Sequence, residues 1–592
     1  MQYKLRFESV VIEKRNMTIK VSGEFIDSSI TADSLATPKV ILHFKHMKED
    51  RRIPVVILFD DIVKVDGRVM FKSEYTYSLD NIFWKTRKAN MPFKMYVNLS
   101  YGNFYEEAVD IDYTPKEFIQ DNFFYSLEIR DDCIKFNTNS EIIHKDHKKE
   151  NFVLLFDRLL KIVAIVLAIP LIPIYIIMGI LTFTGYIKMP AKIETEGKLE
   201  RLISFVMSRM SAVCRESFSM VRLKRHKIKS VYKRFRKRPI KENKITFYSA
   251  RRNELSGNFE FVYNKLKDDK NLDIQFLYNT NTFRFMTKQQ IKEFAEACAT
   301  SKVIVLDEYT PQIHLINLKK ETKIIQLWHA CGAFKTFGFS RLGKPMGSPQ
   351  NTRMHRSYDY VTVSSKYCKK CHSEGFGIAT DNVVPTGIAR TDIFFDEEYK
   401  QNFRNEFYNK YPGFKDKKII LFAPTFRGDV KETAYYPMDL FDINDVCSEL
   451  GDDYAVIIKH HPFITEKQEI PEKYADRVID LSDNTEINDL LFVSDVIITD
   501  YSSLVFEASI VNVPMLFYAY DLEGYIKERD FYFDFKSNIP GKICHSFVTL
   551  MEAIKNEDYE SEKIAPFRDM FFDKLDGNSS QRIADLIYKC LE

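Results

Sequence analysis

The chain lacks several features that mark common protein classes. Its first residues, MQYKLRFESVVIEKR, have no apolar run behind the basic residues, so no signal peptide is visible. It has no Walker loop and no G-x-G-x-x-G segment, which argues against kinase, ATPase and dinucleotide-binding functions. No Asp-x-Asp motif is evident in a loop after a strand-like run. We therefore expect no cofactor and no obligatory catalytic metal.

Cysteine is sparse and its spacing is irregular. The nine cysteines are scattered and odd in number, which suits a reducing compartment better than a secreted disulfide scaffold. Cys368, Cys371 and His372 fit the attachment pattern of haem c, C-x-x-C-H. Without a signal peptide, and without a second cysteine pair at zinc-ribbon spacing, we expect neither haem nor zinc there.

The composition instead indicates several large, folded domains. Of the 592 residues, 45% are apolar and 14% aromatic, enough to bury extensive cores and to argue against general disorder. This length favours two to four domains. The formal net charge of +3 does not by itself predict a polyanionic partner, so the distribution of charge matters more than its sum.

Residues 1–150 are predicted to form a β-sandwich-like module. Short β-branched or aromatic runs, partly alternating and separated by turn residues, occur without helices between them. They are VIEKRNMTIKVSGEF, KVILHFKHM, RRIPVVILF, FKMYVNLSY and EEAVDIDY. No catalytic constellation is seen among them, which favours a docking or structural role.

An uncharged run of 26 residues, Ile162–Ile187, follows. It is long enough to cross a bilayer, which takes about 20 residues. Pro170 and Pro173 each remove a helical hydrogen bond and favour a kink. Basic residues flank both ends, so orientation is not determined. We favour a bent, half-depth insertion over a single span that would export the β-module, and over a buried soluble helix.

A strongly basic stretch, Arg222–Lys241, holds eleven Lys or Arg residues and no acid. It could be an ordinary solvated face, a lipid-binding surface or a nucleic-acid-binding surface. Its position after the apolar run favours anionic membrane lipids. No nucleic-acid-binding motif accompanies it, so we expect no nucleic acid partner. Residues 151–243 are therefore predicted to be a membrane-associating, helical segment.

The remainder is predicted to be α/β. Apolar strand-like runs alternate with helical segments, first over residues 244–400 and then over 401–592, as in two Rossmann-like domains with mostly parallel sheets. In such sheets ligands bind beyond the carboxyl ends of the strands, and the polar motifs of this chain lie there.

Four sequence blocks that contain these polar motifs resemble the CDP-glycerol glycerophosphotransferase family, which comprises the teichoic acid primases and polymerases. They are IIQLWHACGAFKTFGFSR (324–341), ILFAPTFRG (420–428), IIKHHPF (457–463) and DLLFVSDVIITDYSSLVFEA (489–508). Many glycerol-type members carry Trp-His-Gly-Thr-Pro where this chain has WHACGAFK. Four further stretches also look closer to the ribitol-phosphate polymerases: RLGK (341–344), HRSYDYVTVSS (355–365), NVVPTGIARTDIFFD (382–396) and YDLEGYIKERDFY (520–532).

The resemblance implies a glycosyltransferase-B fold, with the acceptor on the first Rossmann-like domain and the CDP-polyol on the second. The activity it implies is transfer of ribitol phosphate from CDP-ribitol to a lipid-linked teichoic acid acceptor, with release of CMP, at the cytoplasmic face of the cell membrane. A CDP-glycerol donor, for teichoic acid or capsule synthesis, is the alternative. A catalytically silent scaffold that binds polyanionic polymer is the rival from another class.

The resemblance gives catalytic roles to two histidines. His329 follows the apolar run KIIQLW and is expected to be the general base, because histidine has an ordinary pKa near neutrality. On local sequence alone it could also be a core histidine beside Trp328. His461, in KHHP, is expected to contact the pyrophosphate and to stabilise charge as CMP departs. His460 is the weaker candidate.

The other site residues are expected to bind phosphate or nucleotide. Ser502 and Ser503 would offer hydroxyls at a helix N-terminus, although simple capping uses the same residues. The resemblance to glycosyltransferase-B folds implies that Glu507 holds the nucleotide ribose. Arginine and lysine can chelate or neutralise phosphate, but could equally be surface cations. The donor-binding candidates are Arg427, Lys459, Asp500, Ser502, Ser503 and Glu507, and the possible phosphate or acceptor contacts are Lys335 and Arg341.

Overall fold

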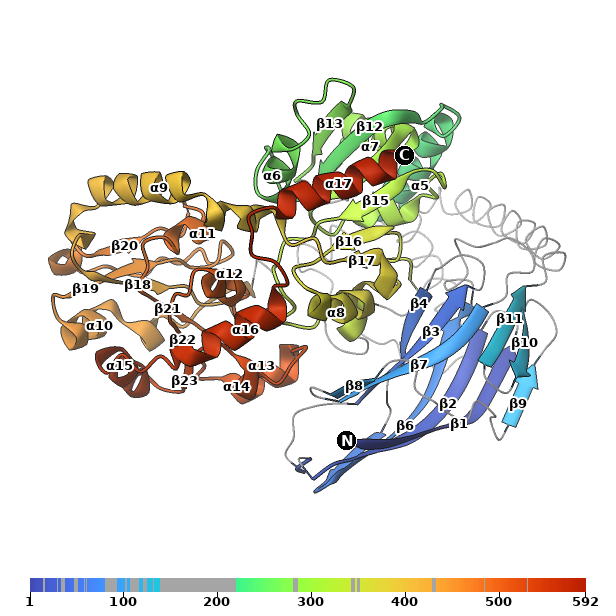
Figure 1. Ribbon diagram of the computed structural model, residues 1–592, viewed down its shortest axis with the longest axis horizontal. Coiled ribbons are helices and arrows are strands. Elements are labelled where there is room, and N and C mark those ends of the chain that lie inside the picture. The colour runs from blue at the N-terminus through green and yellow to red at the C-terminus, as the bar shows by residue number, and fades with distance from the viewer. Residues whose placement is uncertain are drawn as a thin grey trace, which may run out of the picture.

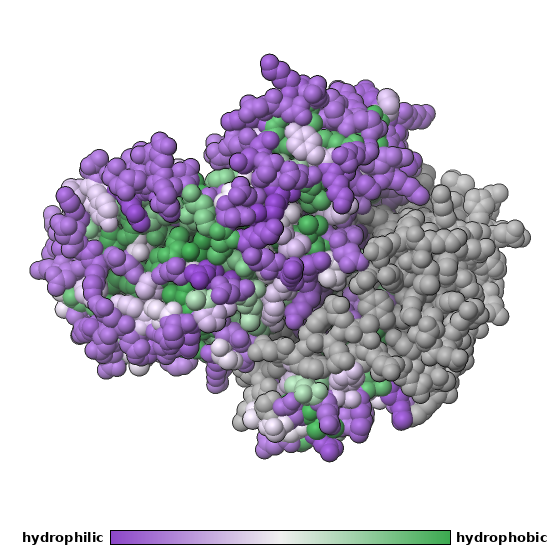
Figure 2. All heavy atoms as spheres, viewed as in Figure 1, coloured by the Kyte–Doolittle hydropathy of each residue, from purple (hydrophilic) through white to green (hydrophobic). Residues whose placement is uncertain are grey.

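The computed structural model contains an N-terminal β region (blue) and two α/β units (green to yellow, then orange to red) (Figure 1). Polar residues cover the outer edges of both α/β units, and apolar residues gather on the middle of the visible face of the second unit (Figure 2). The structure describes residues 1–13, 16–28, 30–32, 38–46, 52–57, 59, 61–79, 93–101, 104–106, 117–120, 125–130, 133–138, 220–280, 286–341, 347–348, 352–428, 433–483, 485–529 and 531–592.

The apolar run 162–187 lies outside the described residues, so the predicted insertion stays a prediction. Within the part of the chain that the structure does describe, no helix combines the length and the apolar character that a membrane span needs.

Two sheets form the β region, which confirms that this part of the chain is all-β. The first has the order β5-β6-β2-β1-β9 and the second β10-β11-β7-β3-β4, with β8 paired to β7. Inward-facing residues of both sheets, among them Phe71 and Phe44, share one core. The strands are β1 Gln2–Glu13, β2 Asn16–Ile26, β3 Lys39–His46, β4 Arg52–Ile57, β5 Asp61–Val65, β6 Arg68–Ser78, β7 Phe93–Tyr101, β8 Phe104–Glu106, β9 Glu117–Gln120, β10 Tyr125–Arg130 and β11 Cys133–Thr138. The predicted strand EEAVDIDY falls mostly outside the described residues.

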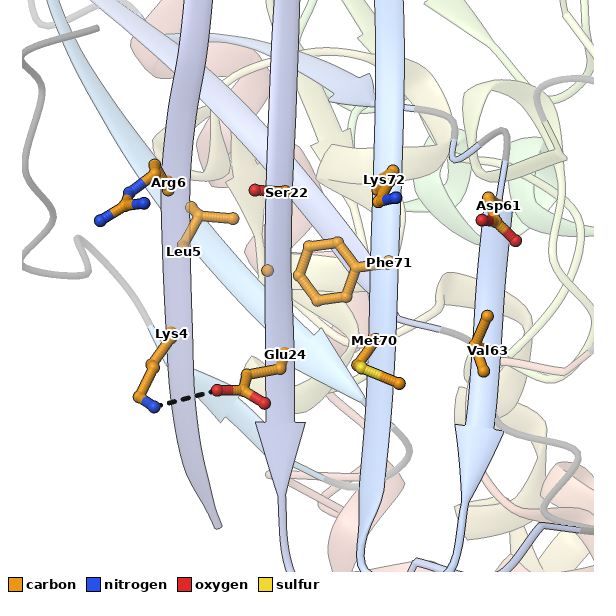
Figure 3. A pocket seen from close by; sticks show the side chains of 11 residues that line it. Lys4, Leu5, Arg6, Ser22, Glu24, Asp61, Val63, Met70, Phe71 and Lys72 are labelled. Atoms are coloured by element: carbon orange, nitrogen blue, oxygen red, sulfur yellow. Dashed lines mark ion pairs between the residues drawn. The ribbon is translucent and has the colours of Figure 1, made fainter. Parts of the chain in front are cut away.

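A concavity of about 580 Å³ lies on strands β1, β2, β5 and β6 (Figure 3). Gly23 opens it, because a Cβ atom at this position would lie 2.4 Å from the Phe71 ring. Its charged residues are of both signs, and Lys4 pairs with Glu24 at 3.0 Å. This surface therefore has no single charge that would select an anionic or cationic ligand.

The first α/β unit is built on a parallel sheet of order β13-β12-β14-β15-β16-β17. Strands such as Ser301–Leu306 are almost wholly buried, because helices cover both faces of such a sheet. The strands are β12 Lys241–Ser249, β13 Asp273–Tyr278, β14 Ser301–Leu306, β15 Lys323–Gln326, β16 Tyr360–Thr362 and β17 Val383–Val384. The helices are α5 Met220–Phe235, α6 Asn258–Asn264, α7 Lys288–Thr300 and α8 Lys366–Phe376, with 3₁₀ turns η3 Pro311–Leu315, η4 Gly338–Arg341 and η6 Ala389–Phe395.

The second α/β unit has a parallel sheet of order β20-β19-β18-β21-β22-β23, the arrangement of Rossmann folds. Its strands are β18 Lys418–Phe422, β19 Tyr454–Ile458, β20 Val478–Asp480, β21 Val496–Thr499, β22 Met515–Tyr518 and β23 Lys542–Cys544. Its helices are α9 Glu397–Lys410, α10 Ile443–Leu450, α11 Ile487–Leu490, α12 Leu504–Ile510, α13 Leu522–Arg529, α14 Phe535–Asn538, α15 Phe547–Lys555 and α16 Ile564–Phe571. The prediction of two parallel, Rossmann-like units is confirmed.

The C-terminal helix α17, Ser579–Leu591, leaves the second unit and packs against the first (Figure 1). Asp392 caps it, accepting hydrogen bonds from the backbone N–H groups of Ser579 and Ser580 at 2.9 and 2.8 Å. Its apolar face, including the fully buried Ile587, joins the core beside β12 and β14. Burying one such side chain contributes about 1.5–3 kcal/mol, so this helix ties the two units together.

Helix α5 shows that the basic stretch also has a packing role. Ile228 and Tyr232 are buried against the first unit, and the Tyr232 hydroxyl donates to the Asn317 carbonyl at 3.0 Å. Lys229 and Lys233 on the same helix are exposed. Part of the segment predicted to associate with membrane is thus packed on the α/β fold while its cations face outward; the domain boundaries themselves stay predictions.

Candidate active site

Three neighbouring strands of the first sheet deliver polar side chains to one edge. Because β12, β14 and β15 are adjacent and parallel, the residues after their carboxyl ends meet. Glu308 follows β14 and His329 follows β15, and His329 Nδ1 lies 3.1 Å from Glu308 Oε2. Arg251, after β12, donates from Nη1 to Glu308 Oε1 at 2.9 Å. The carboxylate therefore joins a cation and an imidazole.

Side chains hold the loop that carries His329 through hydrogen bonds to its backbone. Trp328 has a φ of 58°, a left-handed conformation that is costly for a bulky residue. Its N–H donates to Gln326 Oε1 at 2.9 Å, and its carbonyl accepts from Asn258 Nδ2 at 2.9 Å. The His329 side chain remains 39% exposed, so the alternative of a core histidine beside Trp328 does not describe this structure.

Two adjacent carboxylates at this edge have opposite pKa shifts. Burial raises the pKa of Asp307 to about 6, although Ser249 and Arg252 act against the rise. Burial also raises the pKa of Glu308, but His329 and Arg251 outweigh it, so that this pKa lies below its usual value. Glu308 is therefore a carboxylate near neutral pH and can only accept hydrogen bonds.

His461 follows β19 in the second unit, and its ring is arranged differently. Its Nδ1 accepts from the backbone N–H of Phe463 at 3.1 Å, and the ring packs between Phe426 and Phe463. Burial lowers the pKa of His461 to about 4, and the positive charges of Arg251 and Lys335 add to this effect. The imidazole is therefore neutral near pH 7 and carries its proton on Nε2. Arg251 and Lys335 belong to the first unit, so His461 faces that unit.

His460 is not at the same surface. It is buried beside Phe422 and Tyr436, with ring centroids 5.9 and 5.8 Å away, and burial lowers its pKa.

Arg427 is the centre of an internal ion-pair network. Its Nε and Nη2 donate to the two carboxylate oxygens of Asp521 at 2.7 and 3.0 Å, and its Nη1 donates to Asp500 Oδ2 at 2.9 Å. Burial would lower the pKa of Arg427, but these two carboxylates hold it above its usual value. Asp500 also accepts from the N–H and hydroxyl of Thr425 at 2.7 and 2.9 Å. The loops after β18 and β21 are thereby fastened together.

Lys459 is similarly engaged. Its ammonium group donates to the carbonyls of Leu481, Ser482 and Thr485, at 2.8, 3.0 and 2.5 Å. An ammonium group has three donors, so all of them are used within the protein. In this structure Lys459 fixes the loop after β20.

The residues after β21 differ in exposure. Ser502 Oγ accepts from the Leu504 N–H at 3.2 Å, whereas Ser503 is exposed and its side chain makes no capping hydrogen bond to α12.

Glu507 is buried and forms an ion pair with Arg390 of the first unit. Its Oε2 has no hydrogen-bond partner among the described residues. Arg390 Nη2 also donates to the His329 carbonyl, at 3.1 Å, so it connects the two units at the site.

The two acceptor-side candidates are placed differently. The Lys335 ammonium lies 5.3 Å from the centre of the Tyr525 ring, and its charge acts on His461. Arg341 is buried and donates to the carbonyl of Arg529, which also accepts from the Thr336 hydroxyl at 3.2 Å. Lys335 is therefore associated with the histidine site, and Arg341 connects the two units through α13.

Sequence reasoning singled out His329, His461 and Lys335 but missed three of their neighbours: Arg251, Glu308 and Arg390. A signal existed for the first two, since each charged residue directly follows a strand-like run, ITFYSA or KVIVLD. Among the residues that the structure describes, no cluster of three or more His, Cys, Asp or Glu side chains is placed to hold a metal.

Known proteins resemble this chain in sequence and fold. A teichoic acid poly(ribitol-phosphate) polymerase of Bacillus spizizenii is 44% identical over 357 residues, 60% of this chain and 58% of that protein. The ribitol-phosphate polymerase TarK of Staphylococcus aureus is 43% identical over 356 residues, 59% of this chain and 69% of that protein. The matched part of the chain thus spans under two thirds of the length of the Bacillus polymerase.

The solved structure of the wall teichoic acid polymerase TagF has the same fold. It matches with a TM-score of 0.51 and 24% identity, over 67% of this chain and 98% of that one. Residues 230–589 match the family described as CDP-glycerol:poly(glycerophosphate) glycerophosphotransferase, which is more than half of the chain and includes all four sequence blocks. The predicted family is therefore confirmed: the chain belongs to the CDP-glycerol:poly(glycerophosphate) glycerophosphotransferases.

Proposed function

We propose that this chain transfers ribitol phosphate from CDP-ribitol to a teichoic acid acceptor and releases CMP. Family membership and the identity with two ribitol-phosphate polymerases support this activity. The observation that carries it is the pair of histidines: His329 is held by a carboxylate, and His461, from the other unit, is a neutral imidazole facing the first.

In the proposed reaction, the terminal hydroxyl of the acceptor attacks the phosphorus that bears the donor ribitol. His329 Nε2 takes the hydroxyl proton as the new P–O bond forms. The bond between that phosphorus and the bridging oxygen breaks, and CMP leaves with the bridging oxygen. His461 donates from Nε2 to the phosphates, while Arg251 and Lys335 supply positive charge where negative charge develops.

We assign the donor to the second unit. The hydroxyls of Ser502 and Ser503 would contact its phosphates, and the unpaired Oε2 of Glu507 would accept from a ribose hydroxyl. Arg427 and Lys459 have their donors engaged within the protein. We therefore assign them, with Asp500, to positioning the loops that bind the donor.

For the acceptor we propose Lys335 as the phosphate contact, since among the described residues its ammonium lies against the Tyr525 ring and leaves its hydrogen-bond donors for a ligand. Arg341 would support the same surface through the Arg529 carbonyl. The two α/β units, tied by α17, support a glycosyltransferase-B arrangement, in which donor and acceptor bind to different units and meet between them.

We also propose that the enzyme acts at the cytoplasmic face of the membrane on a lipid-linked acceptor. The exposed cations of α5, such as Lys229 and Lys233, support contact with anionic lipids, at about 1 kcal/mol each. The apolar run 162–187 would contribute far more, at about 25 cal/mol per Å² of apolar surface.

Deleting residues 158–219 tests this localisation. The deletion removes the apolar run and keeps α5, whose Ile228 and Tyr232 belong to the core of the first unit. We expect the full chain to stay on membranes in high salt, and the shortened enzyme to be extracted by high salt while still releasing CMP. Salt extraction of the full chain would contradict the anchoring role of the apolar run.

The donor is tested with purified full-length protein, a primed lipid acceptor, and CDP-ribitol or CDP-glycerol in separate reactions. We expect CMP release with CDP-ribitol. Preference for CDP-glycerol would favour the alternative that the family name suggests, in teichoic acid or capsule synthesis. No release with either donor, from protein that binds polyanionic polymer, would overturn the enzymatic proposal in favour of a scaffold.

A further inference from the structure

We propose that Glu308 is a positioning residue, which fixes the proton of His329 on Nδ1 and leaves the Nε2 lone pair directed at the acceptor hydroxyl. This inference rests on the proposed function, in which His329 is the base. It concerns a residue that the sequence blocks do not contain, since Glu308 lies between the first of those blocks and the preceding strand.

The sheet register brings the two side chains together. Leu306 at the end of β14 is paired with Gln326 at the end of β15, so the residues that follow both strands emerge side by side. Gln326 closes the arrangement: its Nε2 donates to the Glu308 carbonyl at 3.1 Å, and its Oε1 accepts from the Trp328 N–H at 2.9 Å. One amide side chain thus sets the distance between the two loops.

The charge of Glu308 decides the direction of the hydrogen bond. Arg251 donates to Oε1, leaving Oε2 for the imidazole, and the Glu308 side chain is only 17% exposed. A carboxylate accepts and does not donate, so the 3.1 Å contact requires a proton on His329 Nδ1. In the opposite tautomer, the Nδ1 lone pair would face the carboxylate, which is repulsive. A carboxylate that orients a histidine base is a recurring arrangement in enzymes.

Asp307 provides a matched control in the next position of the chain. It is also a buried acid after β14, but it contacts Ser249 at 3.0 Å and Arg252 at 3.3 Å rather than His329. Asp307→Asn and Glu308→Gln each replace a carboxylate by an amide of the same shape. Only the second should affect the proton on His329.

The experiment compares Glu308→Gln, Asp307→Asn and His329→Gln in the full-length enzyme. Thermal unfolding first checks that each variant folds. We expect Glu308→Gln to lower kcat at least about tenfold with an unchanged KM for the donor, and Asp307→Asn to keep kcat near that of the wild type. The control would separate loss of this contact from loss of any buried charge.

Selective ¹⁵N labelling of the twelve histidines supplies a readout that does not depend on activity. The signals absent from His329→Gln identify His329. In the wild type we expect its Nδ1 to be protonated and its Nε2 unprotonated, and in Glu308→Gln a mixture of tautomers. Should Glu308→Gln fail to fold, Glu308→Asp keeps the charge but withdraws the oxygen, and is expected to give a smaller share of the opposite tautomer and a smaller loss of kcat.

Unchanged kcat and unchanged His329 signals in Glu308→Gln would overturn the inference. Equal losses of kcat in Glu308→Gln and Asp307→Asn, with unchanged His329 signals, would also overturn it. Failure of the proposed function looks different: His329→Gln would then retain activity, whatever Glu308→Gln does. An inactive His329→Gln beside a fully active Glu308→Gln would overturn the role of Glu308 alone.

Discussion

The loops that carry His329 and His461 each follow a strand of a six-stranded parallel sheet, but their imidazoles are held in opposite ways. Both loops follow a buried strand of a parallel sheet. The Nδ1 of His329 faces a carboxylate, whereas the Nδ1 of His461 accepts from a backbone N–H. The remaining nitrogen is consequently an acceptor in the first unit and a donor in the second.

The two loops are also fastened by different means. Side chains hold the first, through Gln326, Asn258 and Arg390, and two of these contacts reach the backbone carbonyls of Trp328 and His329. The ammonium of Lys459 fastens the second to three carbonyls. The same type of sheet edge therefore presents a hydrogen-bond acceptor or a hydrogen-bond donor, depending on the partner of a single ring nitrogen.

Removing either imidazole is expected to have the largest effect. His329→Ala deletes the proposed base, and His461→Ala deletes the proposed donor to the phosphates. Loss of a positioned base alone costs about 10²–10⁴-fold in kcat. Steady-state CMP release measures the loss of kcat, and thermal unfolding checks that each variant folds. If both folded variants keep more than about a tenth of the wild-type rate, the proposed mechanism is wrong.

Glutamine substitutions sharpen the contrast between donor and acceptor. The amide of glutamine can donate a hydrogen bond, as proposed for neutral His461, but it cannot take a proton, as proposed for His329. His461→Gln should therefore retain at least about ten times the kcat of His329→Gln, since one hydrogen bond to a charged group contributes about 1.5–3 kcal/mol. Equal rates for the two variants in the same assay would remove the distinction between the two loops.

The sequence predicted the parts of this site that recur at strand ends. The family resemblance singled out both histidines, and the apolar runs before them placed them at the carboxyl ends of strands, where parallel sheets bind ligands. The partners of Lys459 were not predictable, since its carbonyl acceptors lie 22 to 26 residues further along the chain. Nor was the bidentate contact of Arg427 with Asp521, whose residues are 94 positions apart. From the sequence alone, a basic residue that binds a phosphate cannot be distinguished from one that forms an ion pair with a carboxylate of the same protein.

The sequence of helix α5 contains an apolar helical face in addition to its many cations. Ile228, Val231, Tyr232 and Phe235 follow the spacing of one helical face, and that face packs on the first unit. The eleven cations around them led instead to the prediction of a lipid-binding surface. In contrast, the separation of the two α/β units from the β region followed directly from the presence or absence of helices between strands.

Donor and acceptor substitutions test whether the two units bind different substrates. Ser502→Ala and Ser503→Ala should raise the KM for the CDP-polyol about tenfold, because each removes a hydroxyl from the second unit. Lys335→Ala should instead raise the KM for the acceptor. Initial rates with each substrate varied in turn distinguish the two effects. A weakened use of acceptor by the serine variants, with unchanged donor dependence, would reverse the assignment.

The smallest expected effect concerns stability and pH. The pKa of His461 falls from its ordinary value near 6.5 to about 4 on folding, so the unfolded chain binds this proton and the folded chain does not between those pH values. Stability contributed by neutral His461 is complete above about pH 6.5 and is lost as the pH falls towards 4. His461→Gln removes this difference in proton binding between the unfolded and the folded chain. We expect it to reduce the loss of unfolding free energy between pH 7 and pH 5 by about 1 kcal/mol, discounted because the ring is only partly buried. Urea unfolding at both pH values measures the difference. An identical pH dependence in wild type and variant would show that His461 can be protonated in place, and would remove the neutral donor from the comparison.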